Sequence, residues 1–503
     1  MVLAAAVLAS VGVSTWDVAA LTSPTVETGN ESLAAVVDYV DDQRKRLGVP
    51  GMAVGIVVGD EVRVVEGLGV DSDGGRVTPD TLFLINSLSK SVTAFALMQL
   101  VDLGLVDLDA PVTKYVPELA PDGNEVTVRD VLHHRSGVTS ELPAPSDQHD
   151  LESNVQLGPD LEPDAEFQYT NANYDLLALI VERMSGVPFA DYVEDNIFLP
   201  LSMERSAVGT DRAHPYGLAD GHYRWLFFGY QPFNIAVDHG QVGSAAMYST
   251  GSDMAQYLVV HMNEGLYETT SLLSEEGIAT LHEARPFNDE VVYGYGGGLN
   301  VEPANAFDTP AALSPHKTVW HDGASETFRS VMWMTLGPDI GMVILANGND
   351  VIDESWMGQL GLGTRLLIAG EEPIDVTNQA DFLTRWSKHI YLGLALVQAA
   401  FILLVIPTLQ RLHRGQSPSV GQWILLGAAT LIDTTAAILV FVVTPAVAEV
   451  PLATVMELPD YRILISVILL VVAWGIVRTI LASWWLLRSQ NQSASNEPQI
   501  ART

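Results

Sequence analysis

The pattern of apolar and polar positions predicts a mixed α/β domain over the first 370 residues. Met52–Val58 and Glu61–Glu66 are rich in β-branched residues and flank a Gly-Asp pair, which is typical of a β-hairpin. Two more β-rich runs, Phe328–Thr335 and Gly341–Ala346, come late and precede a helical pattern. Strands at both ends with helices between them predict an α/β or α+β sandwich whose terminal strands share one sheet.

One predicted helix is apolar on nearly every face. It begins near Asn86-Ser87, continues through Ser91–Leu103 and ends at Gly104, a C-cap glycine. Because a helix that is apolar all round has no face for water, we expect this one to be buried.

Three long apolar stretches follow this domain and predict transmembrane helices: residues 390–409, 422–444 and 463–487. Each is long enough to cross a bilayer core of about 30 Å at roughly 1.5 Å per residue. Three in succession disfavour the alternative of buried core helices. The sequence thus predicts a domain at 30–370, a linker at 371–389 and a membrane module.

Arginine placement predicts the orientation of these spans. The loop after the first span and the tail, residues 488–503, contain Arg411, Arg414, Arg488 and Arg502. The positive-inside rule puts that loop and tail in the cytoplasm and the large domain outside the cell. Arg385 and Lys388 on the outer side count against this orientation. Residues 1–21, apolar and alanine-rich but without a basic start, predict a signal peptide or an N-terminal anchor.

Two charged residues interrupt the second and third spans. Asp433 lies near the middle of the second, and Arg478 lies in the cytoplasmic half of the antiparallel third. Because an unpaired charge in hydrocarbon is costly, we predict that the two face each other. The alternative is a neutral Asp433 bonded to Thr434 or a carbonyl, with Arg478 reaching toward the headgroups.

Composition restricts the possible functions further. The 503 residues have a net charge of −36, and residues 1–388 alone hold 56 acidic against 19 basic residues, which argues against nucleic-acid binding. Such an acidic, lysine-poor chain resembles proteins of salt-loving archaea; the alternative is an ordinary high-GC bacterium. Cysteine is absent, which excludes disulfides, thiolate metal sites and a cysteine nucleophile.

The first motif with chemical content is Ser87-Leu88-Ser89-Lys90. Ser87 and Lys90 share a helix face, and a helix N-terminus stabilises an oxyanion. A neighbouring amine with a lowered pKa can take the serine proton. The alternative is an N-cap serine and a surface lysine, but this lysine opens the helix that we expect to be buried.

Other patterns predict no cofactor and no metal. His133 and His134 are adjacent and therefore point apart, and no H-E-x-x-H occurs. Gly294–Gly298 is glycine-rich but lacks the strand-to-helix context of a nucleotide loop, so we interpret it as a bend at the rim of a catalytic cleft. G-x-S-x-G is absent, which argues against an α/β-hydrolase.

At these residues the chain resembles the serine β-lactamase and penicillin-binding-protein superfamily, in the branch of class C β-lactamases, DD-peptidases and esterases. The segments that carry the resemblance are TLFLINSLSKSVTAFALMQL, VTVRDVLHHRSGV, FQYTNANYDLLALIVERMSG, VGSAAMYSTGSDMAQYL and VWHDGASETFRSVMWM. The resemblance extends from Glu31 to Ala369. It implies a β-lactamase-like sandwich with an antiparallel sheet and a helical subdomain.

The resemblance also implies roles. Ser87 would be the acylated nucleophile, and Lys90 and Tyr169 the proton-handling pair, with Tyr169 as general base. We expect the charge of Lys90 to lower the pKa of Tyr169. Asn171, of the Tyr-x-Asn motif, would bind the substrate. The backbone N–H groups of Ser87 and of Ala324, the residue after Gly323, would form the oxyanion hole.

The third motif departs from the β-lactamase pattern. It is His321-Asp322-Gly323 where β-lactamases carry Lys-Thr-Gly. We predict that His321 contacts substrate; the alternative is a strand residue bonded to backbone. Because a neutral imidazole binds a carboxylate less well than lysine does, an esterase or peptidase is favoured over a β-lactamase.

The sequence therefore predicts a membrane-anchored, extracytoplasmic serine hydrolase that forms an acyl-enzyme with an ester, amide or D-peptide. The alternative is a non-catalytic binding or sensor module. The expected partners are a small-molecule or peptide substrate and the lipid bilayer, and the oligomeric state stays open.

Overall fold

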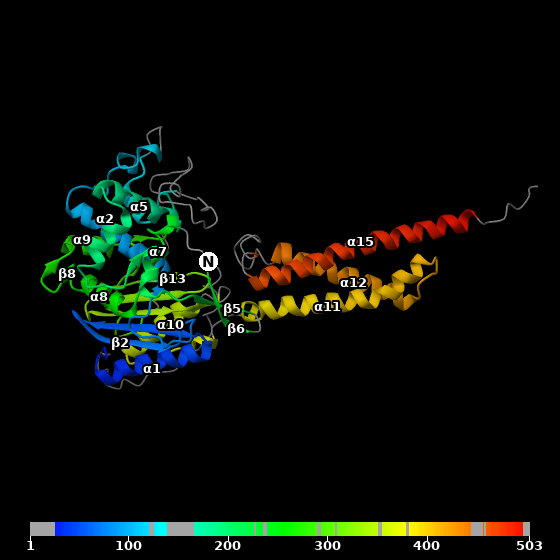
Figure 1. The fold of residues 1–503 in the computed structure, drawn as a ribbon, viewed down its shortest axis with the longest axis horizontal. Coiled ribbons are helices and arrows are strands. Elements are labelled where there is room, and N and C mark those ends of the chain that lie inside the picture. The colour runs from blue at the N-terminus through cyan, green and yellow to red at the C-terminus, as the bar shows by residue number, and fades with distance from the viewer. Residues whose placement is uncertain are drawn as a thin grey trace, which may run out of the picture. The chain divides into compact units, whose positions relative to one another are not determined.

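The computed structural model describes residues 26–119, 125–137, 165–225, 228–234, 239–288, 293–306, 309–350, 355–378, 382–443, 456 and 459–495. The predicted signal segment at 1–21 and the end of the tail lie outside these residues. The chain forms two compact units, residues 1–224 with 230–379 and residues 380–503 with 225–229 (Figure 1).

The first unit is built on one antiparallel sheet of eight strands, in the order β10-β11-β12-β13-β14-β15-β1-β2. These strands are β1 (Gly51–Val58), β2 (Glu61–Gly69), β10 (Arg285–Pro286), β11 (Gly294–Tyr295), β12 (Asn300–Glu302), β13 (Thr318–Ala324), β14 (Arg329–Thr335) and β15 (Ile340–Ala346). Met52 pairs with Ala346 and Val58 with Ile340. The first and last strands are therefore neighbours, which confirms the predicted sharing of one sheet.

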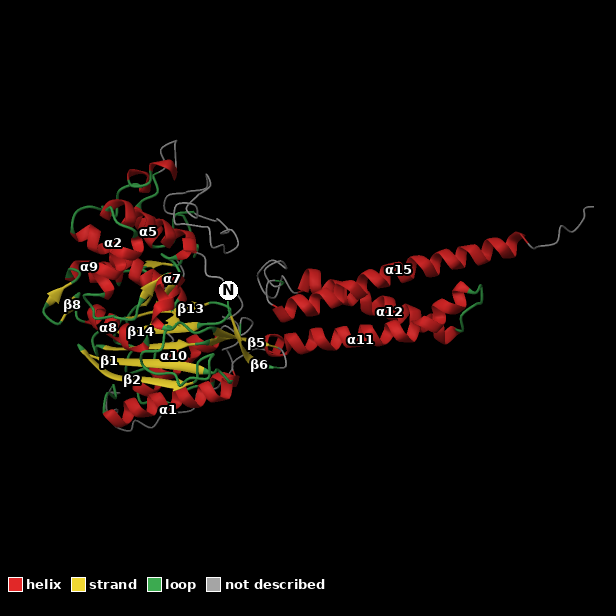
Figure 2. Cartoon of the chain, viewed as in Figure 1, coloured by secondary structure: helices red, strands yellow, loops and turns green. Residues whose placement is uncertain are grey.

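Helices cover both faces of this sheet (Figure 2). On one face, α1 (Asn30–Leu47) and α10 (Ser355–Ile368) pack on the even-numbered residues of β1, such as Val54. On the other face, α8 (Gly251–Met262) approaches so closely that a Cβ on Gly55 would touch the backbone carbonyl of Gly251. Because β1 is buried on both faces, its sequence is a continuous apolar run rather than an alternating one.

A helical subdomain completes this unit. It comprises α2 (Ser89–Asp102), α3 (Val128–Leu132), α5 (Asn171–Ser185), α6 (Phe189–Val193), α7 (Thr210–Ala213) and α9 (Glu275–Leu281). The remaining strands form three small sheets, in the orders β16-β5-β6, β3-β7-β4 and β8-β9. These strands are β3 (Phe83–Leu84), β4 (Ala207–Val208), β5 (Gly221–Trp225), β6 (Gly229–Phe233), β7 (Met247–Ser249), β8 (Leu266–Tyr267), β9 (Thr270–Ser271) and β16 (Gly348–Asn349). Helix α2 is buried over most of its length, as its sequence predicts.

The predicted linker at 371–389 is only partly a linker. The Tyr39 hydroxyl donates to the Ile374 carbonyl at 2.9 Å, and the Val376 N–H donates to Gln43 at 3.1 Å. Val376 is buried against α1. The segment up to residue 378 therefore belongs to the first unit, and helix α11 already begins at Phe382.

The described residues of the second unit form three long helices. They are α11 (Phe382–His413), α12 (Val420–Ile438), which continues as a π-helical turn over Leu439–Val443, and α15 (Pro459–Ser495). Lys388–His413, Val420–Val443 and Asp460–Arg488 are long and apolar enough to cross a membrane. The three predicted spans fall within these segments, except that Thr444 lies outside the described residues.

The predicted ion pair between Asp433 and Arg478 is confirmed. Arg478 Nη2 lies 2.8 Å from Asp433 Oδ2, and both side chains are buried. Arg478 also donates to Thr430 at 3.2 Å, and Gln398 on α11 donates to Asp433 at 3.4 Å. A Cβ on Gly475 would overlap the Asp433 carboxylate, so this glycine makes room for the pair. The polar cluster joins all three helices.

Candidate active site

Ser87 lies in a single 3₁₀ turn, Asn86–Leu88, directly before α2. The preceding residue, Asn86, has a φ of 51°, in the left-handed region that L-residues seldom adopt. Its side chain donates to the Phe328 carbonyl at 3.2 Å, and its own carbonyl accepts from Ser89 Oγ at 2.6 Å. These bonds hold the sharp bend that presents Ser87 at the start of the buried helix.

Lys90 is fully buried and connects the first two motifs. Its Nζ lies 3.2 Å from Ser87 Oγ, 2.7 Å from Asn171 Oδ1 and 2.9 Å from the Ser244 carbonyl. Burial lowers the pKa of Lys90 to about 7, although the Asp175 carboxylate acts in the opposite direction. A neutral amine has two N–H groups for the two closer acceptors, which leaves its lone pair for the serine proton.

Tyr169 completes this group, because its hydroxyl hydrogen-bonds with Ser87 and its ring centroid lies 4.8 Å from Lys90 Nζ. The residue is 43% exposed, but its hydroxyl faces into the site. Burial raises the pKa of Tyr169 above its usual value, and only the bond with Ser87 opposes this. The prediction that Lys90 would lower this pKa is therefore wrong for the free protein: burial of the phenolate dominates, the Asp322 carboxylate adds to the rise, and Lys90 is not among the groups that lower it.

His321, on β13, lies beside Tyr169 with 6.1 Å between the ring centroids. Its Nδ1 is 2.5 Å from the Asp322 carbonyl and its Nε2 is 3.1 Å from the Tyr295 hydroxyl. A carbonyl can only accept, so Nδ1 carries the proton and Nε2 accepts from Tyr295. Burial lowers the pKa of His321 to about 4, although Asp322 acts in the opposite direction. Both nitrogens are thus engaged within the protein, which favours the alternative interpretation of a strand residue bonded to backbone.

Gly323 brings β13 against the nucleophile turn. A Cβ there would lie 2.6 Å from the Ile85 carbonyl and 2.8 Å from Asn86 Cβ. Ser330 on the neighbouring strand donates to the same Ile85 carbonyl at 2.8 Å. Glycine is therefore required for this close approach, and it leaves the next residue, the exposed Ala324, at the edge of the site.

The glycine-rich segment runs over the start of α2. Gly298 has a φ of 75°, and a Cβ on it would lie 2.5 Å from the backbone nitrogen of Ser91. Its N–H donates to the Tyr174 hydroxyl at 2.6 Å. Sequence reasoning missed Tyr295, which this segment places against His321; an aromatic residue within a glycine run was the available signal.

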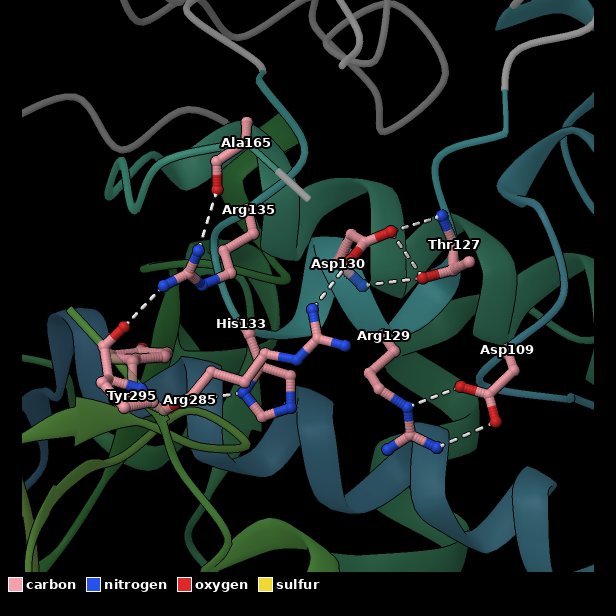
Figure 3. Close-up of polar contacts among 10 residues, drawn as sticks. Asp109, Thr127, Arg129, Asp130, His133, Arg135, Ala165, Arg285 and Tyr295 are labelled. Carbon is pink, nitrogen blue, oxygen red and sulfur yellow. Dashed lines mark hydrogen bonds and ion pairs between the residues drawn. The ribbon is translucent and has the colours of Figure 1, made fainter. Parts of the chain in front are cut away.

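An arginine network links α3 with the segments that contain Ala165 and Tyr295 (Figure 3). Arg285 pairs with Asp130 at 2.9 Å, and Asp130 caps α3. Arg135 donates to the Ala165 carbonyl at 3.1 Å, upstream of Tyr169. His133 Nδ1 lies 2.7 Å from the Tyr295 carbonyl. The network thus ties α3 to the segments that carry two aromatic residues of the site. Within the described part of the chain, no group of three or more metal-ligating side chains occurs.

This fold and site define a class of proteins: a helix-covered antiparallel sheet, with Ser-x-x-Lys and Tyr-x-Asn brought together by one buried lysine. The family model described as Beta-lactamase matches residues 36–355. The chain belongs to this family of serine hydrolases, which confirms the predicted superfamily and fold class.

Relatives agree with this assignment. The chain is 28% identical over 259 residues to penicillin-binding protein 4 of Amycolatopsis lactamdurans, covering 48% of this chain and 68% of the relative. It is 25% identical over 368 residues to an unguisins hydrolase of Aspergillus campestris, covering 67% of this chain and 65% of the relative. The structure of an octameric penicillin-binding protein homologue from Pyrococcus abyssi is similar in fold, with a TM-score of 0.57, 24% identity, and coverage of 72% and 81% of the two chains.

Proposed function

We propose that the chain is a membrane-anchored serine hydrolase that acts outside the cell through an acyl-enzyme on Ser87. One observation carries the proposal: a fully buried Lys90, with a pKa of about 7, contacts both Ser87 Oγ and Asn171 Oδ1. A group that is half neutral near pH 7 is suited to general base catalysis at that pH.

In the acylation step, neutral Lys90 takes the proton of Ser87, and Oγ attacks the substrate carbonyl. The N–H groups of Ser87 and Ala324 bind the developing oxyanion. The Tyr169 hydroxyl, which is neutral before and after this step, relays a proton: it donates its own proton to the leaving oxygen or nitrogen and takes one from the Lys90 ammonium. The carbonyl–heteroatom bond breaks, and an ester of Ser87 remains.

In the deacylation step, water attacks this ester. Lys90, neutral again, takes the proton of the water, directly or through the Tyr169 hydroxyl. Collapse of the second tetrahedral intermediate returns the proton to Ser87 and releases a carboxylic acid. Lys90 is therefore the base in both halves, in place of the Tyr169 base that the sequence predicts.

We propose esters, amides and D-peptides as substrates, in preference to β-lactams. His321 is neutral, with both nitrogens engaged. The guanidinium of the nearby Arg329 pairs with Asp322 at 3.2 Å. In β-lactamases, the lysine of the third motif provides a cation for the substrate carboxylate; here neither His321 nor Arg329 provides such a cation.

We propose that the three apolar helices of the second unit anchor the enzyme, with the catalytic domain on the outer side. Arg411 and Arg414 follow the first span and support this orientation. Lys388, which counts against it, pairs with Asp460 at 3.1 Å, so its charge is compensated.

The test is labelling of the full-length protein with a fluorophosphonate, which phosphonylates activated serines with loss of fluoride. We expect Ser87→Ala to abolish labelling and Ser252→Ala, a serine on α8, to leave it unchanged. Labelling that survives in Ser87→Ala would refute the assignment. Cleavage of the outer domain by a protease added to sealed, right-side-out vesicles tests the orientation.

A further inference from the structure

His134 is a buried residue to which neither the resemblance nor the mechanism above assigns a role. It follows α3 and has a φ of 56°, in the left-handed region. Three parts of His134 contact the Tyr169-Thr170-Asn171 motif or the residues next to it. They are the backbone carbonyl, the Nδ1 atom and the imidazole ring.

The Nδ1 atom bonds the start of the helix that carries Asn171. It accepts from the Thr170 N–H at 3.3 Å and from Asn173 Nδ2 at 3.0 Å. Ser136 Oγ donates to Asn173 Oδ1 at 2.7 Å, which fixes the orientation of that amide. Nδ1 is therefore an acceptor, and the imidazole is neutral with its proton on Nε2. Thr170, the N-cap residue of α5, makes no side-chain cap bond, and His134 instead fixes the N–H of this residue and the Asn173 side chain of the first turn.

The ring and the backbone of His134 hold the preceding residues. The ring centroid lies 4.6 Å from that of Tyr169 and 4.7 Å from that of Tyr295. The His134 carbonyl accepts from the Gln168 N–H at 2.9 Å. One residue thus fixes the chain on both sides of Tyr169.

We propose that neutral His134 is the positioning residue that holds Tyr169 and Asn171 against Lys90. The inference rests on the proposed function, since these are the residues of its proton path. His134 acts through Tyr169 and Asn171 and touches no substrate.

The chemistry of the imidazole supports this role over simple packing. Among the described residues, His134 Nε2 is buried with no hydrogen-bond partner, which is unfavourable. A phenyl ring would fill the same space without that cost, so the Nδ1 acceptor is what the imidazole adds. Burial, and after it the charge of Lys90, hold the pKa of His134 well below its usual value. The acceptor is therefore kept unprotonated.

The test compares His134→Asn, His134→Gln and His134→Phe in the full-length protein. Asn places an amide oxygen where Nδ1 lies, whereas Gln carries the same group one carbon farther out. Phe keeps the ring and removes the acceptor. With a p-nitrophenyl ester as probe, we expect Gln and Phe to lower kcat by about 100-fold at nearly constant KM, because small displacements of catalytic groups cost that much. Asn should restore kcat to within about tenfold of the wild type.

Equal kcat for Asn and Gln, or a Phe variant as active as the wild type, would overturn the proposal. A crystal structure of each variant gives a readout that needs no turnover. We expect the distance between Lys90 Nζ and Asn171 Oδ1 to lengthen in Gln and Phe but not in Asn. An unchanged distance in all three would refute the positioning role, even if the wild type hydrolysed no ester and the proposed function itself failed.

Discussion

Asp175→Asn is the substitution that most sharply tests Lys90 as the base. Asp175 is fully buried on α5, one helical turn after Asn171, and its charge raises the pKa of Lys90. The asparagine variant keeps the shape and removes the charge. We expect the pKa of Lys90 to fall, because burial then acts with less opposition.

The effect on rate follows from the fraction of neutral Lys90. With a pKa of about 7, roughly one tenth of the lysine is neutral at pH 6 and about nine tenths at pH 8. The wild-type kcat/KM should therefore rise about tenfold per pH unit below pH 6 and reach a plateau above pH 8. In Asp175→Asn this rise should occur at lower pH. At pH 6 the variant should therefore reach a larger fraction of its plateau kcat/KM than the wild type does.

The assay is kcat/KM for a neutral ester between pH 5 and 10, since an uncharged substrate adds no titration of its own. Asp191→Asn is the control that should leave the midpoint unchanged, because this half-buried carboxylate pairs with Arg212 and does not act on the pKa of Lys90. If Tyr169 were the base, its raised pKa would make the rate climb through pH 9 without a midpoint near 7. That profile, or an upward shift in Asp175→Asn, would refute the reasoning.

Three further outcomes are expected. Tyr169→Phe should lower kcat by about 100-fold or more with little change in KM, because proton transfer acts in the transition state; equal changes in both would indicate a binding role. Asp433→Asn and Arg478→Gln should each destabilise the detergent-solubilised protein by about 3 kcal/mol, and the double variant by less than the sum; simple additivity would contradict a coupled pair. The melting temperature of the full chain should rise steeply from about 0.1 M to 2 M KCl, since the −37 charge of residues 1–388 is screened within about 3 Å at 1 M; no dependence on salt would contradict the halophilic interpretation.

Much of the fold could be predicted because its signals are local. The β-branched runs at Met52–Val58 and Gly341–Ala346 became adjacent strands, and the all-apolar pattern after Ser87 became a buried helix. Even the contact between Asp433 and Arg478 could be predicted, because long apolar segments offer few partners for a charge.

The environment of the site could be predicted only in part. Spacing brought Ser87 and Lys90 together, but the rise in the pKa of Tyr169 depends on burial by segments distant in the sequence. The same holds for Tyr295, which reaches His321 from a different strand. His134 lies in a segment that carries the family resemblance, but its role could not be predicted, because that role depends on a left-handed backbone and on the start of another helix.

The central claim, that Ser87 forms an acyl-enzyme, is tested most directly by mass spectrometry of the full-length protein quenched in acid during turnover of an activated ester. The account predicts a mass increase equal to one acyl group, located by digestion on the peptide that contains Ser87 and absent from Ser87→Ala. Turnover without any adduct, or an adduct on another residue, would contradict it.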